Sequence, residues 1–510
     1  GVNLTDTNTQ VQLSNMTVTQ SGTNDLILVQ NLPVTVAGPL LSSVTTNISL
    51  GDAVLAMTGS SLTVTGAGTS ALLQFNGGNV TTGAELAFIH PSGSLMLGNR
   101  SLLDATNTIF LSGTDTGFTS PFLALDAGAT LSSSSTSPLL SLNGGSVTTQ
   151  TGEDFIKIGE TGGPAATVTL AGGVLKLQNI SSGNFTIGSG TLARLQGGST
   201  LSHHGVLDLT NTALSLTGPL TRLEGGSTIT AVSGPFVQIN GGSLTLTSGT
   251  LPGVLTSADG TANHINRTGG FLTATNSTIS IVTTSSIGPS DVVSVTLGAS
   301  DANLRLTDSN LTLTGTNASM GGFGNTASPT INGVHLIATN TGGATETISL
   351  EGTVLSINNG PTLTNTAAQI QLTNMSVTQT GGTASAFVNL TGSAVTMSGP
   401  LLSISGGTLT WKNALISDGS TLSNSSTSPL VSLTNTSVTT TPSGALFLGT
   451  TSGAASLNGP LLVASNSTLS LAGAPLAMSG GSTLTNTTTS PFLDLTGGSL
   501  TLGLRAVYIP

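Results

Sequence analysis

Residue types that catalyse reactions or bind metals are sparse in this sequence. Of its five histidines, only His203 and His204 are adjacent, and they lie beside Gly205 with Asp208 as the nearest carboxylate. A metal held by two histidines would need further ligands from neighbouring strands. We expect both histidines to be exposed turn residues, and we predict neither a metal site nor a cofactor.

One pair of neighbouring acids, Glu153 and Asp154, occurs in the segment TGEDFIKIG. Adjacent residues on a strand face opposite sides, so the two carboxylates could act on one substrate only if the chain turned there. We expect a solvated corner instead. Sugar-binding grooves usually offer aromatic platforms, but Trp411 and Tyr508 are the sole Trp and Tyr. The sequence therefore predicts a protein that is not an enzyme, with a carbohydrate-active β-helix enzyme as the alternative.

Hydroxyl side chains recur at alternate positions, which gives a second kind of candidate surface. In GGSLTL from Gly497, Leu500 and Leu502 would point inward while Ser499 and Thr501 point outward. Stacked copies of such a segment would display ranks of hydroxyls, and regular threonine arrays resemble the surface of ice-binding solenoids. The alternative explanation is that threonine is simply a good strand former with a soluble face.

Composition excludes several classes of protein. Charged residues make up 6% of the chain, and the 20 acids and 9 bases are scattered without a basic stripe, so we expect no nucleic-acid partner. No cysteine is present, which excludes disulfides and suits a durable protein outside the cell. Polar residues interrupt every apolar run well short of the roughly 18 residues of a spanning helix, so we predict no transmembrane segment. Residue 1 is Gly rather than Met, and we expect a processed or truncated chain.

A short repeat dominates the sequence. Its template is a small residue, Pro, an apolar alternation, a Gly-Gly or Asn-Thr break, and a second alternation. Equivalent starts near the C-terminus lie at nearly constant spacing, at Pro429, Ala445, Pro460, Pro475 and Pro491. A unit this short cannot bury its own apolar face, whereas stacked coils can. The pattern predicts an all-β, parallel β-solenoid (β-helix) with coils of about 16 residues.

Local chemistry agrees with stacking. Gly-Gly pairs suit corners that need positive φ, and Pro suits the start of a strand. Because Asn76, Asn143 and Asn240 each precede a Gly-Gly pair, we expect an asparagine ladder if their coils align. Regular coils are predicted for residues 1–250 and, with a C-terminal tail, for 344–510. Degenerate coils with loop excursions are predicted for 251–343, and a separate small domain is the alternative there.

At this template the chain resembles extracellular β-solenoid repeat proteins, including autotransporter passenger regions and filamentous-haemagglutinin-like adhesins. The resemblance covers most of the chain but rests on composition and coil pattern. It implies surface exposure, adhesion or fibre formation. Coils in those passengers are generally longer than the coil predicted from this repeat, a departure from the family pattern.

The residue after each template proline lies off the strand alternation. If Leu493 and Leu495 face the core, that residue would line an exposed apolar ridge, which usually marks an interface. We therefore predict a self-association ridge, with the alternative that each residue is rotated into the core at a corner. The predicted ridge consists of Phe122, Leu139, Leu220, Phe236, Leu401, Leu430, Leu461, Leu476 and Phe492.

Solenoid ends are open strand edges that need caps or partners. The last residues, LGLRAVYIP, differ from the repeat, and we predict head-to-tail docking through Arg505, Tyr508 and Pro510, with a docked or frayed tail as the alternative. The sequence thus favours a self-assembling structural subunit of an extracellular fibre or cell-surface layer, forming a homo-oligomer or filament. Alternatives are a monomeric passenger-type adhesin with a cell-surface or glycan receptor, an ice-binding solenoid, and the β-helix enzyme.

Overall fold

The computed structural model contains strands, turns and bends, and no helix among the residues that it describes. The chain divides into two compact units, Gly1–Arg267 with Ile287–Asp291, and Thr268–Ser286 with Val292–Pro510. The structure describes all residues except 115–119, 248–254, 258–262, 283–291, 315–321, 324–329, 343–344, 358–361, 381–385, 392–393, 441–443, 450–452, 505–506 and 509–510.

Each turn of the first unit passes through four short strands. In one turn these are β6 (Leu41–Val44), β7 (Asn47–Leu50), β8 (Leu55–Thr58) and β9 (Ser61–Val64), after which β10 (Leu73–Asn76) lies parallel to β6. Leu41 pairs with Leu73, and Leu73 pairs with Leu103 on the following turn. The predicted parallel β-solenoid is confirmed, but the predicted coil length of about 16 residues is wrong, because equivalent strands lie about 32 residues apart. Each copy of the short repeat forms half a turn, so two consecutive copies form the opposite parts of one coil.

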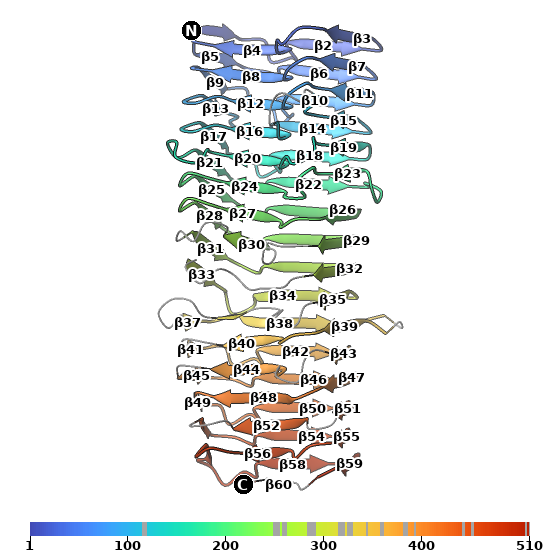
Figure 1. The fold of residues 1–510 in the computed structure, drawn as a ribbon, viewed down its shortest axis with the longest axis vertical. Coiled ribbons are helices and arrows are strands. Elements are labelled where there is room, and N and C mark those ends of the chain that lie inside the picture. Colours follow the sequence, from blue (N-terminus) through green and yellow to red (C-terminus); the bar gives the residue numbers. More distant parts are fainter. Residues whose placement is uncertain are drawn as a thin grey trace. The chain divides into compact units, whose positions relative to one another are not determined.

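Stacking of equivalent strands forms four parallel sheets in the first unit, named 1a to 1d in the order in which a turn visits them (Figure 1). Sheet 1a contains β2 (Val11–Ser14), β6, β10, β14 (Leu103–Thr106), β18 (Leu140–Asn143), β22 (Leu175–Gln178), and the first parts of β26 (Leu207–Leu216) and β29 (Val237–Thr247). Sheet 1b contains β3 (Thr17–Gln20), β7, β11 (Asn79–Thr81), β15 (Ile109–Leu111), β19 (Ser146–Thr148) and β23 (Phe185–Thr186), and the second parts of β26 and β29 pair with each other beyond the same corner. Sheet 1c contains β4 (Ile27–Gln30), β8, β12 (Ala87–Ile89), β16 (Leu123–Leu125), β20 (Ile156–Ile158), β24 (Ala193–Leu195), β27 (Thr221–Leu223) and β30 (Leu255–Ser257). Sheet 1d contains β1 (Val2–Leu4), β5 (Val34–Val36), β9, β13 (Ser94–Met96), β17 (Thr130–Ser133), β21 (Thr167–Leu170), β25 (Thr200–His203), β28 (Thr228–Ala231) and β31 (His264–Thr268).

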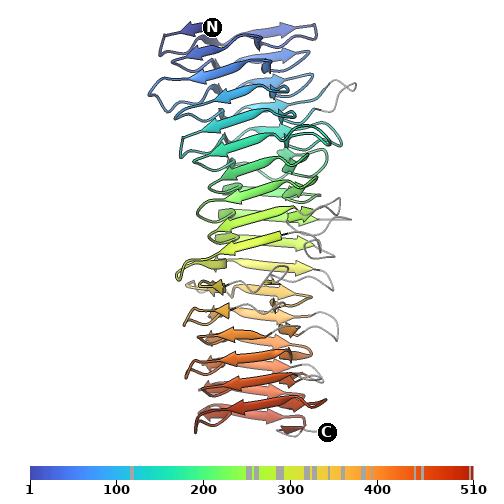
Figure 2. The same ribbon diagram turned by 90° about the vertical axis from the view of Figure 1, so that its left-hand side faces the viewer.

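The second unit repeats the arrangement in sheets 2a to 2d, whose strands Figure 2 shows from the side. Sheet 2a contains the first part of β32 (Leu272–Val282), β34 (Ala302–Thr307), β38 (Val334–Thr339), β42 (Ile370–Thr373), β46 (Leu402–Ser405), β50 (Val431–Thr434), β54 (Leu462–Ser465) and β58 (Leu493–Thr496). Sheet 2b contains the second part of β32, β35 (Asn310–Thr314), β39 (Thr347–Leu350), β43 (Ser376–Gln379), β47 (Thr408–Trp411), β51 (Ser437–Thr440), β55 (Thr468–Leu471) and β59 (Ser499–Leu502). Sheet 2c contains β36 (Gly322–Phe323), β40 (Leu355–Ile357), β44 (Val388–Thr391), β48 (Ala414–Gly419), β52 (Ala445–Gly449), β56 (Leu476–Met478) and β60 (Val507–Tyr508). Sheet 2d contains β37 (Thr330–Ile331), β41 (Thr362–Leu363), β45 (Val395–Met397), β49 (Thr421–Asn424), β53 (Ala454–Leu457) and β57 (Thr483–Asn486), and β33 (Val292–Thr296) lies between β32 and β34 in the chain.

The period-2 alternation decides which residues face the interior. In β18, Leu140 and Leu142 are buried, whereas Ser141 and Asn143 are partly exposed. Equivalent leucines of neighbouring turns stack because the strands pair in register, so each turn completes the apolar interior of the next. The core of the first unit also contains a run of contacting rings, in which Phe122 stacks on Phe155 with centroids 4.7 Å apart.

A residue in the left-handed conformation turns the chain at the corner between sheets a and b. Asparagine tolerates this backbone better than most residues, and glycine has no steric penalty there. The column of left-handed corner residues consists of Asn15, Thr45, Gly77, Asn107, Gly144, Asn179, Asn211, Gly241, Asn276, Asp308, Asn374, Gly406, Asn435, Asn466 and Gly497.

The two kinds of corner, Asn-x and Gly-Gly, fit against one another on successive turns. A Cβ on Gly144 would overlap the Oδ1 atom of Asn107, and a Cβ on Gly145 would overlap the carbonyl oxygen of Thr108. The same Asn-to-Gly contact recurs between Asn211 and Gly241, Asn374 and Gly406, and Asn466 and Gly497. Gly-Gly therefore meets two requirements, a positive φ and a close approach to the preceding turn.

The predicted asparagine ladder is wrong. Asn76 and Asn143 both pair with Thr106, so the turn that contains Thr106 lies between them and their amides cannot bond to each other. Asn143 instead accepts a hydrogen bond from the Nδ2 atom of Asn179, at 2.8 Å.

The predicted irregular segment 251–343 contains the boundary between the two units. Its described strands remain regular, because β32 pairs in parallel with β34 and β35, and β34 pairs with β38. Most of the predicted loop excursions lie outside the described residues, so degenerate coils there remain a prediction.

We predict that Gly145→Ala destabilises the turns around it more than Gly183→Ala does. Both glycines have positive φ, of 74° and 82°, but nothing lies within 4 Å of a Cβ on Gly183. The left-handed backbone costs each alanine about 1–2 kcal/mol, and only Gly145→Ala adds a backbone overlap. Hydrogen exchange of β14 and β18 should accelerate in the first variant alone. Equal effects of the two substitutions would contradict this account of the corner.

Candidate functional site

The predicted self-association ridge lies mainly in the core, so the prediction of an exposed ridge is wrong. Seven of its side chains are at most 3% exposed, namely Phe122, Leu139, Leu220, Phe236, Leu401, Leu430 and Leu461. Leu476 and Phe492 are half-buried. The chain bends at the residue after each proline, so this residue and the first strand residue both point inward, as Leu139 and Leu140 do.

The histidine pair is divided between the interior and the surface. His203 is the last residue of β25 and is fully buried, its ring in edge contact with Phe236. Its Nδ1 atom accepts a hydrogen bond from the amide of Gly205 at 2.8 Å, and burial lowers its pKa to about 3. His204 is exposed, and its Nδ1 atom lies 2.7 Å from the Oγ atom of Ser233. His203 is therefore a neutral core residue, contrary to the predicted exposed turn.

The acid pair is also asymmetric, because Asp154 is buried rather than solvated. Asp154 accepts a hydrogen bond from Ser189 Oγ at 2.5 Å and lies 3.8 Å from the guanidinium of Arg194. Burial raises the pKa of both Asp154 and Glu153. Asp154 is held within an ion-pair network, and Glu153 beside it is partly exposed.

That network continues onto the outer face of sheet 1c. Lys157, Arg194 and Arg222 occupy one register position on β20, β24 and β27. Glu224 lies 2.9 Å from Arg194 and 2.6 Å from Arg222 and accepts a further bond from Gln196. Burial opposes ionisation of Glu224, but the hydrogen bonds and both guanidinium groups outweigh it and lower its pKa.

Sequence reasoning missed this rank of three cations. Its members lie far apart along the chain, at positions 157, 194 and 222, and only the full-turn register brings them together. Three of the chain's nine basic residues thus form one surface column, in which Arg194 and Arg222 both pair with the buried Glu224. An internally paired network of this kind tethers neighbouring turns.

Three carboxyl groups flanking the same sheet have raised pKa values. Burial is the main cause for each, raising the pKa of Asp25 and of Asp126 to about 6 and that of Glu85 to about 7. Asp52 adds repulsion at Asp25, and Glu160 adds repulsion at Asp126. Around Glu85, the backbone and Lys157 favour ionisation while Asp52 and Asp126 oppose it. These groups bind protons more tightly in the fold than in the unfolded chain.

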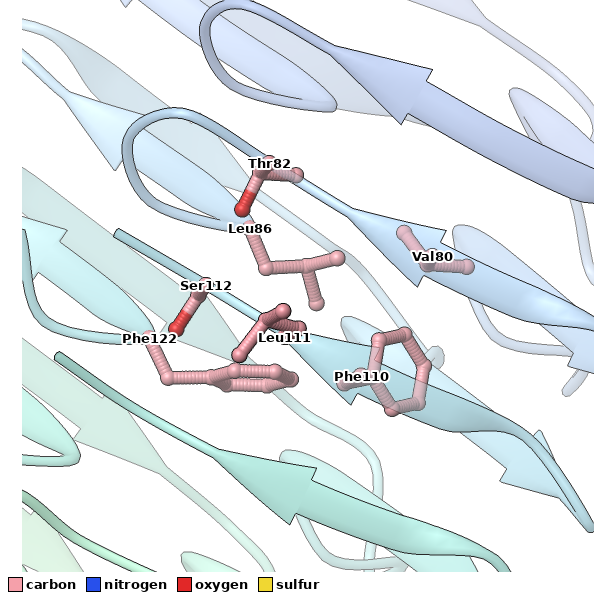
Figure 3. A pocket seen from close by; sticks show the side chains of 7 residues that line it. All are labelled: Val80, Thr82, Leu86, Phe110, Leu111, Ser112 and Phe122. Atoms are coloured by element: carbon pink, nitrogen blue, oxygen red, sulfur yellow. The ribbon is translucent and has the colours of Figure 1, made fainter. Parts of the chain in front are cut away.

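A narrow apolar crevice, too tight to hold a water molecule, lies between two turns of the first unit (Figure 3). Figure 3 shows the rings of Phe110 and Phe122 and the side chain of Leu86 around it, with the hydroxyls of Thr82 and Ser112 at one side. Small-molecule pockets are usually about 300 Å³ or larger. The crevice has no charged or imidazole side chain in its lining and is best described as imperfect packing.

The predicted outward hydroxyls are on the surface. Ser499 and Thr501 are exposed in β59, and the paired β55 presents Thr468 and Ser470 in the same manner. Leu500, predicted to face inward, is 43% exposed because β59 pairs on one side only among the described residues. Ranks of hydroxyls therefore exist on sheet 2b.

Most of the residues predicted for C-terminal docking lie outside the part of the chain that the structure describes. Arg505 and Pro510 lie outside the described residues, and Tyr508 belongs to β60, whose backbone pairs in parallel with β56. Docking through these residues remains a prediction.

We predict that Phe236→Ala destabilises its turn by about 3–5 kcal/mol, the usual cost of truncating a buried aromatic side chain. The matched control is Phe492→Ala, at the equivalent but half-buried template position, which should cost less. Chemical denaturation and hydrogen exchange of β26 and β29 provide the measurement. A small effect of Phe236→Ala, equal to that of the control, would show that the ring does not support the core.

We predict that the first unit is more stable at pH 5.5 than at pH 7.5. Because the folded pKa values of Asp25, Asp126 and Glu85 exceed their ordinary values, the stabilisation is full below about pH 4 and is lost as pH rises through about 6 and 7. Glu85→Gln should raise the denaturation midpoint at pH 7.5 and flatten the pH dependence. A midpoint that rises from pH 5.5 to 7.5 in the unmodified chain would contradict the assignment.

Within the described part of the chain, no helix has the length and apolar character needed to cross a bilayer, and no three His, Asp or Glu residues are grouped to hold a metal ion. No protein-family model and no curated protein matches the sequence. The surface and the internal stacking of the solenoid are therefore the features that bear on function.

Proposed function

We propose that this chain is a structural subunit of an extracellular fibre or cell-surface layer, in which copies associate end to end. The observation that carries the proposal is the parallel stacking of turns in register, in which each turn completes the apolar interior of the next. Other supports are the absence of cysteine from the sequence, its low charge, and an interior closed by repeated backbone ladders.

The first turn can be compared with an internal copy of its own sequence. The segment QVQLSNMTVTQ from Gln10 recurs as QIQLTNMSVTQ from Gln369. In the internal copy Ile370 and Met375 are 0% and 1% exposed, whereas the equivalent Val11 and Met16 are 39% and 45% exposed. The same side chains are thus core residues wherever another turn covers them.

The last full turn shows the same contrast on its opposite face. Leu495 and Leu500 are 39% and 43% exposed, although their register partners Ala464 and Leu469 are 2% and 3% exposed. Among the described strands, β2 pairs only with β6 and β58 only with β54, so both turns also carry an unpaired backbone edge. Such an edge is a template for pairing with another chain.

In the proposed assembly a second copy supplies a further turn, which buries the apolar positions of these turns and continues the parallel ladder. The last turn carries a Gly-Gly corner and the first an Asn corner, and inside the chain the Gly-Gly corner of β46 and β47 is followed by the Asn corner of β50 and β51. A monomeric passenger-type adhesin is the alternative, in which the outer faces bind a receptor.

We predict that the full chain forms filaments and that Met16→Lys prevents them, since a charge at the uncovered turn cannot be buried in a joint. Sedimentation velocity at several concentrations and negative-stain electron microscopy provide the measurement. The matched control is Ile109→Lys, which removes an apolar side chain that is 49% exposed but faces outward in the middle of sheet 1b.

Filaments formed by Ile109→Lys and not by Met16→Lys, with unchanged circular dichroism, would support end-to-end assembly. Loss of filaments in Ile109→Lys alone would indicate a lateral contact instead. A chain that stays monomeric at every concentration would contradict the proposal and leave the adhesin alternative.

A further inference from the structure

Sheet 2b carries two ranks of hydroxyl side chains on its outer face. Each of its strands contributes at least two outward residues, and equivalent residues of adjacent strands are register partners. The first rank consists of Thr278, Asn310, Thr347, Ser376, Thr408, Ser437, Thr468 and Ser499, and the second of Ser280, Thr312, Ser349, Thr378, Thr410, Thr439, Ser470 and Thr501. All sixteen side chains are exposed or partly exposed, and fifteen are Ser or Thr.

A third rank runs along the neighbouring end of sheet 2a. Its eight members all bear hydroxyls: Thr275, Thr307, Thr339, Thr373, Ser405, Thr434, Ser465 and Thr496. Figure 1 shows the strands of sheet 2b one above another beside those of sheet 2a. We call the three ranks together the hydroxyl face.

Geometry makes the hydroxyl face a lattice. Adjacent parallel strands are about 4.8 Å apart, and outward residues two positions apart on one strand are separated by about 6.6 Å. Neighbouring hydroxyls also approach as water molecules do, since Ser376 Oγ and Thr408 Oγ1 are 2.8 Å apart, the usual O–H···O distance.

Buried side chains and paired strands hold the hydroxyl face in a fixed geometry. Between the two ranks of sheet 2b, Leu409 and Val438 point inward and are fully buried, and Trp411 donates from Nε1 to the carbonyl of Ala445 at 2.9 Å. Strands such as β47 and β51 are paired on both sides. An array of this kind retains its spacing without the ordering cost that a flexible surface would have.

The chemistry of the hydroxyl face restricts its ligand. None of its 24 positions carries a charge, so an ionic surface is a poor match. Sugar chains usually bind on aromatic platforms, and Trp411 lies inside rather than on this face. A neutral, periodic, hydrogen-bonding solid remains, and crystalline water has oxygen repeats of the same order as the lattice of hydroxyls.

The equivalent face of the first unit does not continue the pattern. On sheet 1b the outward residues of β15 are Ile109 and Leu111, which are 49% and 41% exposed. These apolar residues break the ranks of sheet 1b, whereas both ranks of sheet 2b continue through all of its described strands.

We infer that the hydroxyl face of the second unit binds ice. Its hydroxyls take the places of surface oxygens in the crystal, while the threonine methyl groups between them order the adjoining water. This inference is independent of end-to-end assembly, because it concerns the side of the solenoid and not its uncovered turns.

The test measures the gap between the melting and freezing points of a single ice crystal in solutions of the full chain. We expect a gap that grows with protein concentration and faceted crystals, and we expect Thr439→Lys to reduce the gap several-fold. The matched control is Thr148→Lys on sheet 1b, which changes an equally exposed outward threonine whose register partner is Leu111, and it should keep the gap.

Circular dichroism of each variant checks the fold, and the double variant with Thr410→Lys enlarges the lesion at a register partner of Thr439. A gap no larger than that of albumin at equal mass concentration would overturn the inference. So would a Thr148→Lys variant that loses as much activity as Thr439→Lys, or retention of the chain on crystalline cellulose or chitin without any effect on ice growth.

Discussion

In-register stacking of parallel turns is the constraint on which the rest of this structure depends. A half-turn has too little apolar surface to fold alone, and its leucines are buried only when the same register position of the next turn covers them. Leu402, Val431 and Leu462 illustrate this, since they pair in sequence and are each at most 2% exposed. The cost of burying the backbone is met by the ladders between turns.

The close stacking of turns restricts which residues can occupy the corners. The left-handed residue between sheets a and b is Gly, Asn or Asp at every position of the column except Thr45, and the closeness of successive turns decides between Gly and the larger residues. Where Asn107 lies beneath, Gly144 leaves room for the amide oxygen, and the next residue, Gly145, leaves room for a carbonyl. Insertions are tolerated between such corners, because the step from Leu103 to its partner Leu140 is longer than the step from Leu73 to Leu103.

Much of the fold could be predicted from sequence because the repeat itself encodes it. Strand alternation, Gly-Gly corners and parallel stacking all follow from local patterns. The coil length could not be predicted, because two similar halves of a long coil produce the same local signal as two complete short coils. Only pairing such as Leu41 with Leu73 distinguishes the two. The ridge prediction failed for a related reason, since alternation does not hold across a bend, and Leu139 and Leu140 both turn inward.

The candidate surfaces were predictable to different degrees. Outward hydroxyls follow from alternation alone, so the orientation of Ser499 and Thr501 could be predicted, whereas their continuity along sheet 2b required the full register. The rank of Lys157, Arg194 and Arg222 was invisible in the sequence because its members are separated by unequal insertions. Burial of His203 depended on where β25 ends, which the repeat does not specify.

The most direct test of the central claim is the distance between spin labels on outward positions of sheet 2a. In the chain, which has no cysteine of its own, labels at Ser403→Cys and Ser432→Cys should show the strong coupling of neighbouring strands about 5 Å apart. Labels at Ser403→Cys and Ser417→Cys, half a turn apart and on different sheets, should show much weaker coupling. Strong coupling of the second pair and weak coupling of the first would contradict a parallel turn made of two repeats.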